Sequence, residues 1–295
     1  MPQRSRGFRN HYRSQMPWTE VLTKDARSML QDAASFVLNG GKLPSMVVYP
    51  DYPSKKTTLF KIAHALRFRI TNKRLRRPDL VLWFHDTTHA SSALLVQSYP
   101  NARVINAQCT DISKTKVDQL HAEIFGYSTF IDPVQHQGPA VEKSDINALH
   151  DGSIITCPIA QPNGKSVYQL VIDNSTSSGE YLDYRVPVIG GHIPLVYGKY
   201  KRNEVRFTND VHRSEMLDIK STFSAEELLL IQTFALKMGA EFCELDVLRD
   251  NASQRIYIID VNKTPYGPPK GLGKANTKKA VHLLTEAFRA AFISG

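Results

Sequence analysis

The sequence predicts a mixed fold in two parts, a small parallel α/β unit followed by a larger antiparallel α+β unit. The chain has 295 residues, about twice the length of a typical single domain. Up to about residue 110, short apolar runs alternate with helical patterns, which is typical of parallel strands joined by helical crossovers. Beyond that point, apolar runs follow one another across short turns, which indicates antiparallel hairpins. We therefore expect the boundary between the two units near residue 110.

The composition is that of an ordinary globular protein, with 42% hydrophobic and 22% charged residues. The longest apolar runs, such as Leu228–Ile231 and Ile256–Ile259, are far shorter than the ~20 residues of a membrane span. No charged segment leads into an apolar one at the N-terminus, which argues against secretion. The three cysteines, Cys109, Cys157 and Cys243, are widely spaced and form no CxxC pair. We therefore expect a cytoplasmic protein with reduced thiols and no membrane span.

Residues 1–20 are polar and rich in arginine, and we expect them to form a loose basic arm. Residues 21–110 are expected to form the α/β unit, which begins with an amphipathic helix over Val21–Val37. The pair Gly40–Gly41 is a typical helix end. The other elements predicted for this unit are strands at Ser45–Tyr49, Asp79–His85 and Ala102–Asn106, and helices at Thr57–Leu66 and Thr88–Gln97.

Residues 111–295 are expected to form the second unit. Gly190–Gly191 lies between two apolar runs and predicts a tight hairpin, because both turn positions can take positive φ. Ser224–Glu227 is a capping-box pattern at the start of a long helix, and Gly239 follows the end of that helix. The predicted helices are Ser113–Gly126, Ser224–Met238 and Thr277–Phe292, and the predicted strands are Ala140–Lys143, Ser153–Pro158, Val167–Asp173, Leu182–Ile189, His192–Tyr200, Phe242–Arg249 and Ile256–Asn262.

The charge is strongly basic, because 37 lysines and arginines against 28 acids leave a net charge of +9. Between Ser54 and Pro78 there is no acid at all, and we call Lys55–Arg77 the basic stretch. Such stretches attract polyanions, so this one predicts an anionic substrate or partner. A merely solvated, solubilising face explains the same charges, and both interpretations stay open. The members are Lys55, Lys56, Lys61, Arg67, Arg69, Lys73, Arg74, Arg76 and Arg77.

Three oxygen-bearing side chains near the C-terminus form a candidate metal site. Asp246 lies in the first strand of a predicted hairpin, and Asp260 and Asn262 lie near the end of the second. Residues two apart on a strand share a face, and an antiparallel register exists that puts Asp246 beside them. Two carboxylates and an amide oxygen suit Mg²⁺ or Mn²⁺. The simpler alternative is that Asp-Val-Asn only ends a strand.

The same segment resembles the metal-binding end of the ATP-grasp superfamily, an acidic residue followed by (E/D)-x-N-x-x-P. Asp246, Asp260, Asn262 and Pro265 match that pattern, with aspartate where glutamate is more common at position 260. A long helix ending in Met238–Gly239 precedes it, as in the superfamily. The resemblance covers about residues 105–292. It implies an ATP-grasp fold of antiparallel sheets and helices, with ATP bound between two lobes and Mg²⁺ beside it.

The resemblance also implies contacts to the phosphates of ATP. Lys114 or Lys116 stands where the superfamily has a lysine at the start of the helix leading into its ATP domain. Lys143 stands where a strand lysine reaches the α- or β-phosphate. The segment Asp145–Ser153, with Gly152, occupies the place of the flexible loop that covers the phosphates.

Adenine contacts are implied along Val167–Asp173, which resembles the hinge strand that holds the base by backbone hydrogen bonds. The last residue of that strand would lie nearest the ribose. The implied contacts are Gln169, Leu170, Val171, Ile172 and Asp173.

Substrate contacts are implied by the segment Asp183–Gly191, which resembles the D-x-R-v-x-v-v-g-g hairpin of amino-acid ligases in the superfamily. Arg185 would lie near the acyl phosphate or substrate. On the returning strand, Lys199 or Lys201 would contact phosphate.

The leading function implied is ATP-dependent ligation, in which a carboxylate is activated as an acyl phosphate and joined to an amine of an amino acid or peptide-like substrate. One alternative is an ATP-grasp kinase that phosphorylates a hydroxyl of a small anionic substrate, for which the basic stretch is suited. Another is a non-catalytic nucleotide-binding module with a basic partner-binding surface. The α/β unit would correspond to the pre-ATP domain that contacts substrate. The oligomeric state stays open, and a homo-oligomer is compatible with the sequence.

The histidines offer a zinc interpretation, because His85 and His89 are four residues apart and would share one face of a helix. However, His85 ends a strand pattern, and the sequence signals no third ligand. We prefer a strand-end loop at the edge of a substrate cleft, in which Asp86, Thr87 and Thr88 cap the next helix.

Overall fold

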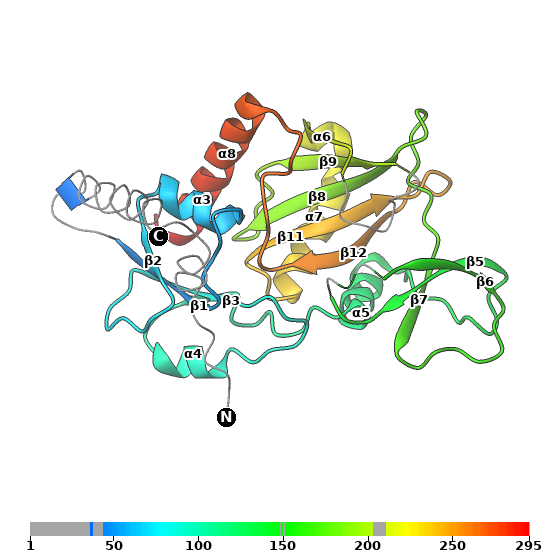
Figure 1. Ribbon diagram of the computed structural model, residues 1–295, viewed down its shortest axis with the longest axis horizontal. Helices are drawn as coiled ribbons and strands as arrows, with labels where there is room; N and C mark the ends of the chain where they lie inside the picture. The colour runs from blue at the N-terminus through cyan, green and yellow to red at the C-terminus, as the bar shows by residue number, and fades with distance from the viewer. Residues whose placement is uncertain (1–35, 38–43, 148, 150, 203–210, 295) are drawn as a thin grey trace, which may run out of the picture.

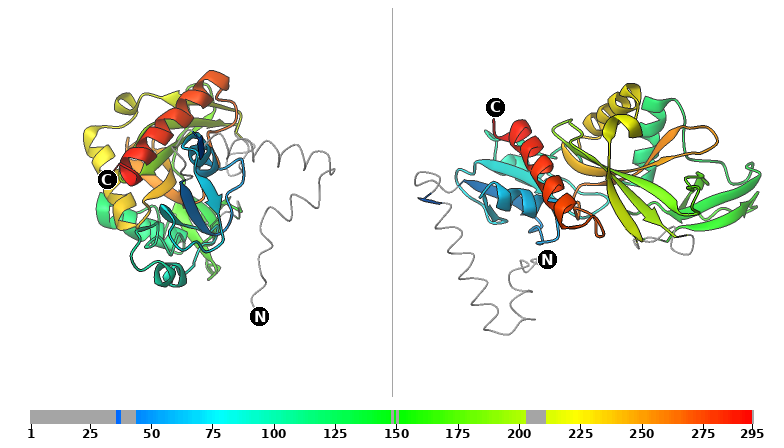
Figure 2. Two further views of the ribbon diagram at one scale, coloured as in Figure 1. Left: turned by 90° about the vertical axis from the view of Figure 1, so that its left-hand side faces the viewer. Right: turned by 90° about the horizontal axis from the view of Figure 1, so that it is seen from above.

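The computed structural model describes residues 36–37, 44–147, 149, 151–202 and 211–294. The predicted basic arm and most of the helix predicted over Val21–Val37 lie outside these ranges. The described chain forms three sheets and their covering helices, arranged along one long axis (Figures 1 and 2). At one end is a parallel sheet, in the middle a five-stranded antiparallel sheet, and at the other end a three-stranded antiparallel sheet.

The first sheet is parallel, as the alternation of strands and helices predicts, and its order is β2-β1-β3-β4. Met46–Val48 of β1 and Val81–Phe84 of β3 are buried, in agreement with the apolar runs of these central strands. The edge strand β2 was not predicted, because it is only three residues long and lies within the polar basic stretch. The elements are β1 (Ser45–Pro50), α3 (Thr58–Ala65), β2 (Arg69–Thr71), β3 (Leu80–Phe84), α4 (Ala93–Ser98) and β4 (Val104–Ile105).

Helix α4 begins at Ala93 rather than at Thr88, where the sequence pattern predicts its start. The residues before α4 form backbone hydrogen bonds with the segment that precedes residue 113, the first residue of the next predicted helix. Ala90 donates its backbone N–H to Thr110 O (2.8 Å), and Ile112 donates to Thr88 O (2.9 Å). This pairing removes the first predicted turn from the helix.

The central sheet is antiparallel with the order β10-β9-β8-β11-β12. The predicted hairpin at Gly190–Gly191 is present: both glycines have positive φ (58° and 81°), and Ile189 and His192 exchange backbone hydrogen bonds. Strands β11 and β12 have the predicted bounds, whereas β10 was not predicted. The strands are β8 (Tyr181–Ile189), β9 (Val196–Lys201), β10 (Arg213–Leu217), β11 (Phe242–Arg249) and β12 (Ile256–Asn262).

One face of the central sheet is apolar and lies against two helices, α5 (Lys114–Phe125) and α7 (Ala225–Lys237), while the short helix α6 (Ile219–Thr222) precedes α7. Strand residues such as Val186, Leu245 and Val261 are completely buried in this core. Both helices have the predicted ends. Ser113 caps α5, Gly126 ends it at φ 78°, and the capping box at Ser224 starts α7.

The opposite side of the central sheet carries charged residues, and we call it the charged face. Because side chains alternate along a strand, these residues are the sequence neighbours of the apolar core. The charged face consists of Asp183, Arg185, Lys199, Lys201, Glu244, Asp246, Asp260 and Asn262, with Tyr197 and Ser214 beside them.

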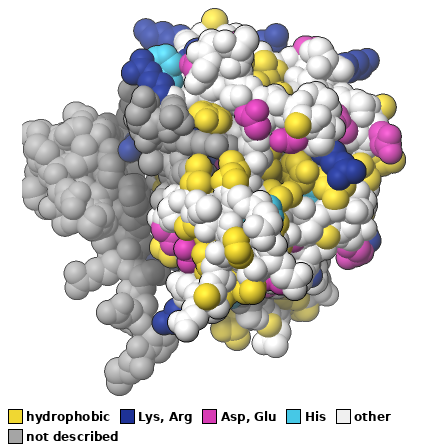
Figure 3. All heavy atoms as spheres, turned by 90° about the vertical axis from the view of Figure 1, so that its right-hand side faces the viewer, with side chains coloured by type: hydrophobic (Ala, Val, Ile, Leu, Met, Phe, Trp, Pro, Cys, Tyr) yellow, Lys and Arg dark blue, Asp and Glu magenta, His cyan; other side chains and the backbone are white. Residues whose placement is uncertain are grey.

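The third sheet has the order β6-β5-β7 and forms the far end of the molecule (Figure 1). Its strands are β5 (Gly138–Ser144), β6 (Ser153–Cys157) and β7 (Ser166–Leu170). Hydrophobic side chains are visible on this end among few charges (Figure 3). Val134, Ile146, Leu149 and Ile154 are between 45% and 55% exposed.

The last helix, α8 (Lys274–Phe292), packs beside α3 on the parallel sheet (Figures 1 and 2). These two helices lie at opposite ends of the described sequence. Leu284 and Phe288 share a buried core with Leu59 and Ile62 of α3 and with Phe84 of β3. The two ends of the described chain therefore share one core.

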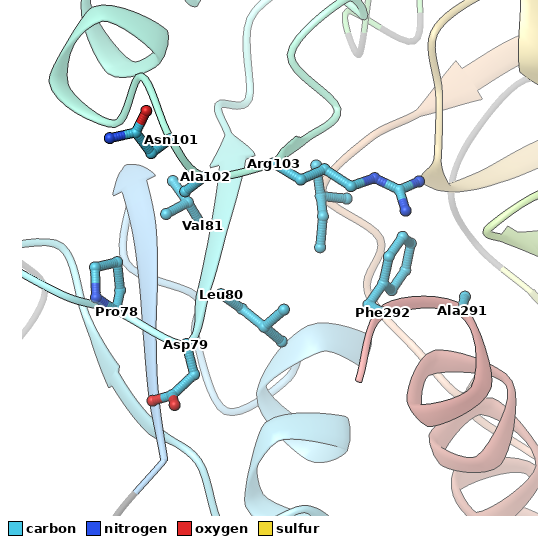
Figure 4. Close-up of a pocket in the computed structure, with 10 residues that line it drawn as sticks. Pro78, Asp79, Leu80, Val81, Asn101, Ala102, Arg103, Ala291 and Phe292 are labelled. Atoms are coloured by element: carbon cyan, nitrogen blue, oxygen red, sulfur yellow. The ribbon is translucent and has the colours of Figure 1, made fainter. Parts of the chain in front are cut away.

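A pocket of about 400 Å³ lies between the start of β3, the segment before β4 and the end of α8 (Figure 4). Arg103 points toward Phe292, with its guanidinium 5.3 Å from the ring centre, and pairs with Glu241. This pocket is at the amino ends of the parallel strands. The charged residues described below lie elsewhere, so the pocket is not part of the candidate site.

No helix within the described ranges is long and apolar enough to cross a membrane. Cys109, Cys157 and Cys243 are all free and buried.

Candidate functional site

The predicted metal ligands lie on adjacent strands of the central sheet. Asp246 on β11 is directly opposite Asp260 on β12, and Glu244 is directly opposite Asn262. The register shifts only after Asp246, so the pairing is regular through both acidic positions. The structure thus brings Asp246, Asp260 and Asn262 together on the charged face.

Arg185 binds Asp246 across the β8–β11 pair. Its Nε donates to Oδ1 (2.9 Å) and its Nη2 donates to Oδ2 (3.1 Å), which is the bidentate geometry of a strong ion pair. Its third nitrogen, Nη1, is 3.4 Å from Glu244 Oε2. Lys199 Nζ is 3.9 Å from Asp246 Oδ1. Burial alone would raise the pKa of Asp246, but Arg185 and Lys199 together hold that pKa below its usual range.

Two other acids of the charged face have raised pKa values. Burial and, to a smaller extent, the nearby charge of Asp246 raise the pKa of Glu244 to about 7, against the opposing charge of Arg185. Burial, and next the charge of Asp246, raise the pKa of Asp260 to about 6. A cation bound between Asp246 and Asp260 would favour the ionised form of Asp260 and so oppose this shift.

The donor set fits a hard divalent cation by its chemistry. Asp246 and Asp260 supply carboxylate oxygens and Asn262 an amide oxygen, and each oxygen has more than one lone pair. Asn262 Oδ1 also accepts from Thr264 N (2.9 Å), which holds the amide in place. No three histidine, cysteine or acidic side chains form a metal cluster within the described ranges, and this set contains only two acids.

The predicted phosphate lysines, Lys114 at the start of α5 and Lys143 on β5 of the three-stranded sheet, both interact with the charge of Asp260. Burial and, next, the charge of Lys114 lower the pKa of Lys143 to about 8, while Asp260 acts in the opposite direction. Burial lowers the pKa of Lys114, and Asp260 is the largest opposing influence. Lys116 is exposed on another face of α5. The structure therefore places Lys114 and Lys143, but not Lys116, next to the carboxylates.

The predicted phosphate-covering loop is fastened at its start. Asp145 accepts from Thr115 N through Oδ1 (2.8 Å), and Lys114 Nζ donates to Ile146 O (2.8 Å). Asn147 N donates to Thr88 Oγ1 (2.9 Å), so the loop also contacts the loop that follows β3. Gly152 lies at the other end of this segment, directly before β6, and is partly exposed.

The predicted adenine segment connects the three-stranded sheet to the central one. At one end, Leu170 N donates to Thr129 O (2.8 Å), and the buried Gln169 side chain donates to Thr129 Oγ1 (2.6 Å). At the other end, Asp173 N donates to Asp250 Oδ1 (3.1 Å) in the β11–β12 turn. Between them, Val171 is partly buried and Ile172 is buried. Gln169 is therefore held by Thr129, and the backbone after it crosses between the two sheets.

The two lysines predicted on β9 have different partners. Lys201 Nζ forms a buried ion pair with Asp183 Oδ2 (2.8 Å), whereas Lys199 is directed toward Asp246. Burial lowers the pKa of Lys199, and Asp246 opposes that shift. Lys199 is thus the lysine nearer to the predicted metal ligands.

Sequence reasoning missed Glu244 and Tyr197, both nearly inaccessible to solvent on the charged face. Glu244 is two residues before Asp246 on the same strand, so the period-two spacing was a usable signal. Tyr197 is likewise two residues before Lys199 on β9, so the same spacing placed it on the face of the predicted lysines.

The two histidines of the zinc interpretation diverge. His85 Nδ1 is 3.0 Å from Asp51 Oδ2, and His89 Nδ1 is 3.2 Å from Asp111 Oδ1. They follow a strand rather than sharing a helix face, and each has its own acidic partner.

The arrangement of the sheets is that of the ATP-grasp fold. The match to solved ATP-grasp ligases spans most of this chain, and it confirms the fold that the C-terminal motif predicts. Comparison with protein-family models and with curated proteins yields no match.

Three solved structures illustrate the likeness. The ATP-grasp ligase PsnB, complexed with a phosphomimetic variant of its minimal precursor, Mg and ADP, matches at a TM-score of 0.57 and 12% identity, over 85% of this chain and 99% of that one. VanG D-Ala:D-Ser ligase from Enterococcus faecalis matches at 0.54 and 10% identity, over 85% and 100%. D-alanine–D-alanine ligase from Bacillus anthracis, complexed with ATP, matches at 0.54 and 11% identity, over 85% and 96%.

Proposed function

We propose that this protein is an ATP-dependent ligase that activates a carboxylate as an acyl phosphate and joins it to an amine. The observation that carries the proposal is the convergence at Asp260. Lys114 and Lys143 reach it from one side, and Asp246 and Arg185 from the central sheet. In the ATP-grasp fold, cations beside a carboxylate pair suit a metal-bound polyphosphate lying between two lobes.

Lys114 and Lys143 are proposed to bind the phosphates of ATP. Their ammonium groups are partly desolvated, so each contact to a phosphate oxygen is stronger than it would be in water. The peptides of Leu170–Ile172 are proposed to hold adenine, and Asp173 the ribose. Gly152 and its loop would close over the phosphates.

Asp246, Asp260 and Asn262 are proposed to hold Mg²⁺, and Mn²⁺ suits the same oxygen ligands. When bound, the metal neutralises charge on the phosphates. Arg185 keeps Asp246 ionised and in a fixed orientation through its two hydrogen bonds. The neutral Asn262 contributes an oxygen without adding a third negative charge.

Arg185, Lys199 and Lys201 are proposed as the catalytic cations. Arg185 would stabilise the oxyanion that develops when the amine attacks, and Lys199 would neutralise the phosphate that leaves. Lys201 would support Lys199 from the buried pair with Asp183. This is catalysis by positioning and electrostatics, so the proposal requires no side-chain nucleophile.

The neighbours support the proposed substrate classes. PsnB was also solved with a precursor peptide, and the other two neighbours are ligases of small amino acids. We propose an amino acid or peptide-like substrate that contacts the predicted pre-ATP unit, residues 21–110.

The basic stretch is proposed to bind an anionic substrate or partner rather than ATP. Arg74, Arg76 and Arg77 are exposed in the loop between β2 and β3. Changing these three arginines to glutamate should weaken binding of that substrate and reduce its salt dependence, while the affinity for ATP stays the same. Equal losses of both affinities, measured by titration at two salt concentrations, would contradict this division.

The function is tested by incubating the protein with ATP, Mg²⁺, pooled amino acids and short peptides. A ligase releases phosphate and forms an amide product, which mass spectrometry detects. A kinase instead forms ADP and a phosphorylated product without free phosphate. The basic stretch would suit the anionic substrate of such a kinase. ATP binding without any turnover would favour the non-catalytic module and would refute the ligase.

A further inference from the structure

Three buried polar atoms without a hydrogen-bond partner lie on the charged face. They are Tyr197 Oη, Ser214 Oγ and Glu244 Oε2. Buried polar groups in native proteins are nearly always paired, so a group of unpaired atoms next to a candidate active site indicates a bound molecule that satisfies them.

Glu244 is the strongest of the three. Its Oε1 accepts a hydrogen bond from Thr58 Oγ1 (3.3 Å). Gly267 packs against the same oxygen so closely that a Cβ atom at this position would lie only 3.1 Å from it, so no space remains for a ligand at Oε1. Its Oε2 is 3.4 Å from Arg185 Nη1, and Arg185 donates hydrogen bonds from its other nitrogens to Asp246. Lys199 and Lys61 interact with Glu244 only through their charges, so Oε2 accepts no hydrogen bond and can take an additional cationic donor.

Tyr197 lies on the same face of the sheet as Glu244, one strand further along. It pairs across the strands with Arg185 of β8, and β8 lies between Tyr197 and the β11 strand that carries Glu244. Burial, and next the charge of Glu244, raise the pKa of Tyr197, which agrees with a hydroxyl close to that carboxylate. Ser214, opposite Lys199 on β10, extends the same surface.

We propose that Glu244 Oε2 and Tyr197 Oη form the subsite for the ammonium group of a primary amine. The proposal rests on the proposed function, in which this group is the acceptor of the ligation: the bound ammonium loses one proton to water, and the free amine then attacks the acyl phosphate and displaces phosphate. An ammonium group offers three donors and one positive charge, so it can serve Glu244 and Tyr197 together and balance the carboxylate. A hydroxyl or thiol acceptor would bring one donor and no charge.

A bare metal ion fits these atoms poorly, because Ca²⁺ and Mg²⁺ take six or more oxygen ligands and only one carboxylate oxygen is open here. The amine reaches Glu244 from the side of Arg185 and Asp246, whose side chains remain 14% and 21% exposed. That route passes the predicted metal ligands, so the nitrogen would lie next to the place where a carboxylate is activated.

The subsite is tested with methylammonium chloride as the probe, in calorimetric titrations of the full chain at pH 8.5 and constant ionic strength. Methylammonium should bind saturably, and tetramethylammonium, which has no N–H donor, should not. Glu244→Gln should weaken methylammonium binding at least tenfold, and Tyr197→Phe severalfold. Glu215→Gln removes a carboxylate from the other face of the same sheet and should bind as the parent does.

The proposal is overturned if the parent does not bind methylammonium, if it binds tetramethylammonium equally well, or if Glu244→Gln binds methylammonium as the parent does. Circular dichroism identifies a variant that fails to fold. If Glu244→Gln does not fold, the difference between methylammonium and tetramethylammonium binding to the parent protein decides whether the subsite exists.

A kinetic measurement separates this proposal from the proposed function. With an acyl donor found in the screen, Glu244→Gln should raise the KM for the amine at least tenfold more than the KM for ATP, and an unchanged ratio would overturn the subsite. If the parent turns over no donor, the proposed function fails, while methylammonium binding still decides whether the subsite exists.

Discussion

The two faces of the central sheet are built from the same strands but have opposite character. Val186, Leu245 and Val261 are fully buried beneath α5 and α7, whereas their neighbours Arg185 and Asp246 lie on the charged face and stay partly exposed. Because side chains alternate along a strand, each strand contributes to the core with one residue and to the site with the next. A register slip of one residue would exchange the faces, so the core also secures the register of the site.

This comparison predicts that substitutions on the charged face change chemistry and that substitutions on the apolar face change stability. The largest effect is expected for Asp260→Asn, which removes one carboxylate of the predicted metal site. Mg²⁺-dependent turnover of ATP should be abolished, and the melting temperature should stay the same or rise, because a partly desolvated charge is lost.

Glu215→Gln is the matched control, because it removes an acid from the opposite face of the sheet and should keep full turnover. A folded Asp260→Asn protein that retains full ATP-dependent activity would refute the metal site.

On the apolar side, Phe234→Ala should lower the free energy of unfolding by about 3–5 kcal/mol, because it leaves a cavity in the core. Phe234 is completely buried on α7, facing the sheet. Urea denaturation measures the change. ATP affinity, measured on the folded fraction, should stay close to that of the parent, and a loss of affinity as large as the loss of stability would break the comparison.

The next effect depends on pH. His121 on α5 is completely buried among Phe125, Tyr127 and Tyr257, and burial lowers its pKa to about 4. In the unfolded chain the pKa of histidine is about 6.5, so the unfolded state binds more protons between pH 6.5 and 4. Stability is therefore complete above about pH 6.5 and is lost as the pH falls.

That loss should reach about 2–3 kcal/mol at pH 4. In His121→Leu, residue 121 cannot be protonated. The fall in unfolding free energy between pH 7 and pH 4 should therefore be smaller than in the parent by this amount. Urea denaturation from pH 7 to 4 measures both slopes, and identical slopes would show that His121 does not titrate on unfolding.

The smallest effect is expected for Lys143→Ala, which should weaken ATP binding by about 1.5–3 kcal/mol, the worth of one hydrogen bond to a charged group. Lys116→Ala is the control, because Lys116 is exposed on another face of α5 and should leave ATP affinity unchanged. Calorimetric titration with ATP compares the two variants. The reverse ranking would assign the phosphate contact to Lys116.

Much of the fold follows from local patterns in the sequence. The β11–β12 hairpin has the predicted bounds, because its apolar runs alternate around a turn rich in Asp, Asn and Ser. The ends of α5 and α7 follow equally directly from capping residues. Strands β2 and β10 were not predicted. Both are short edge strands with few apolar residues, so their sequences lack the apolar pattern of a buried strand.

By itself, the sequence determined that a parallel sheet is followed by antiparallel sheets, and it determined the hairpin that carries Asp246, Asp260 and Asn262. These features depend on the periodicity and turn chemistry of neighbouring residues. Only the tertiary structure decided that α8 returns to α3, that Arg185 holds Asp246, and that Glu244 Oε2 and Tyr197 Oη are buried without a hydrogen-bond partner. The physical reason is that these contacts join residues far apart in the chain, and their energies depend on burial and distance, which arise only when the sheets and helices pack.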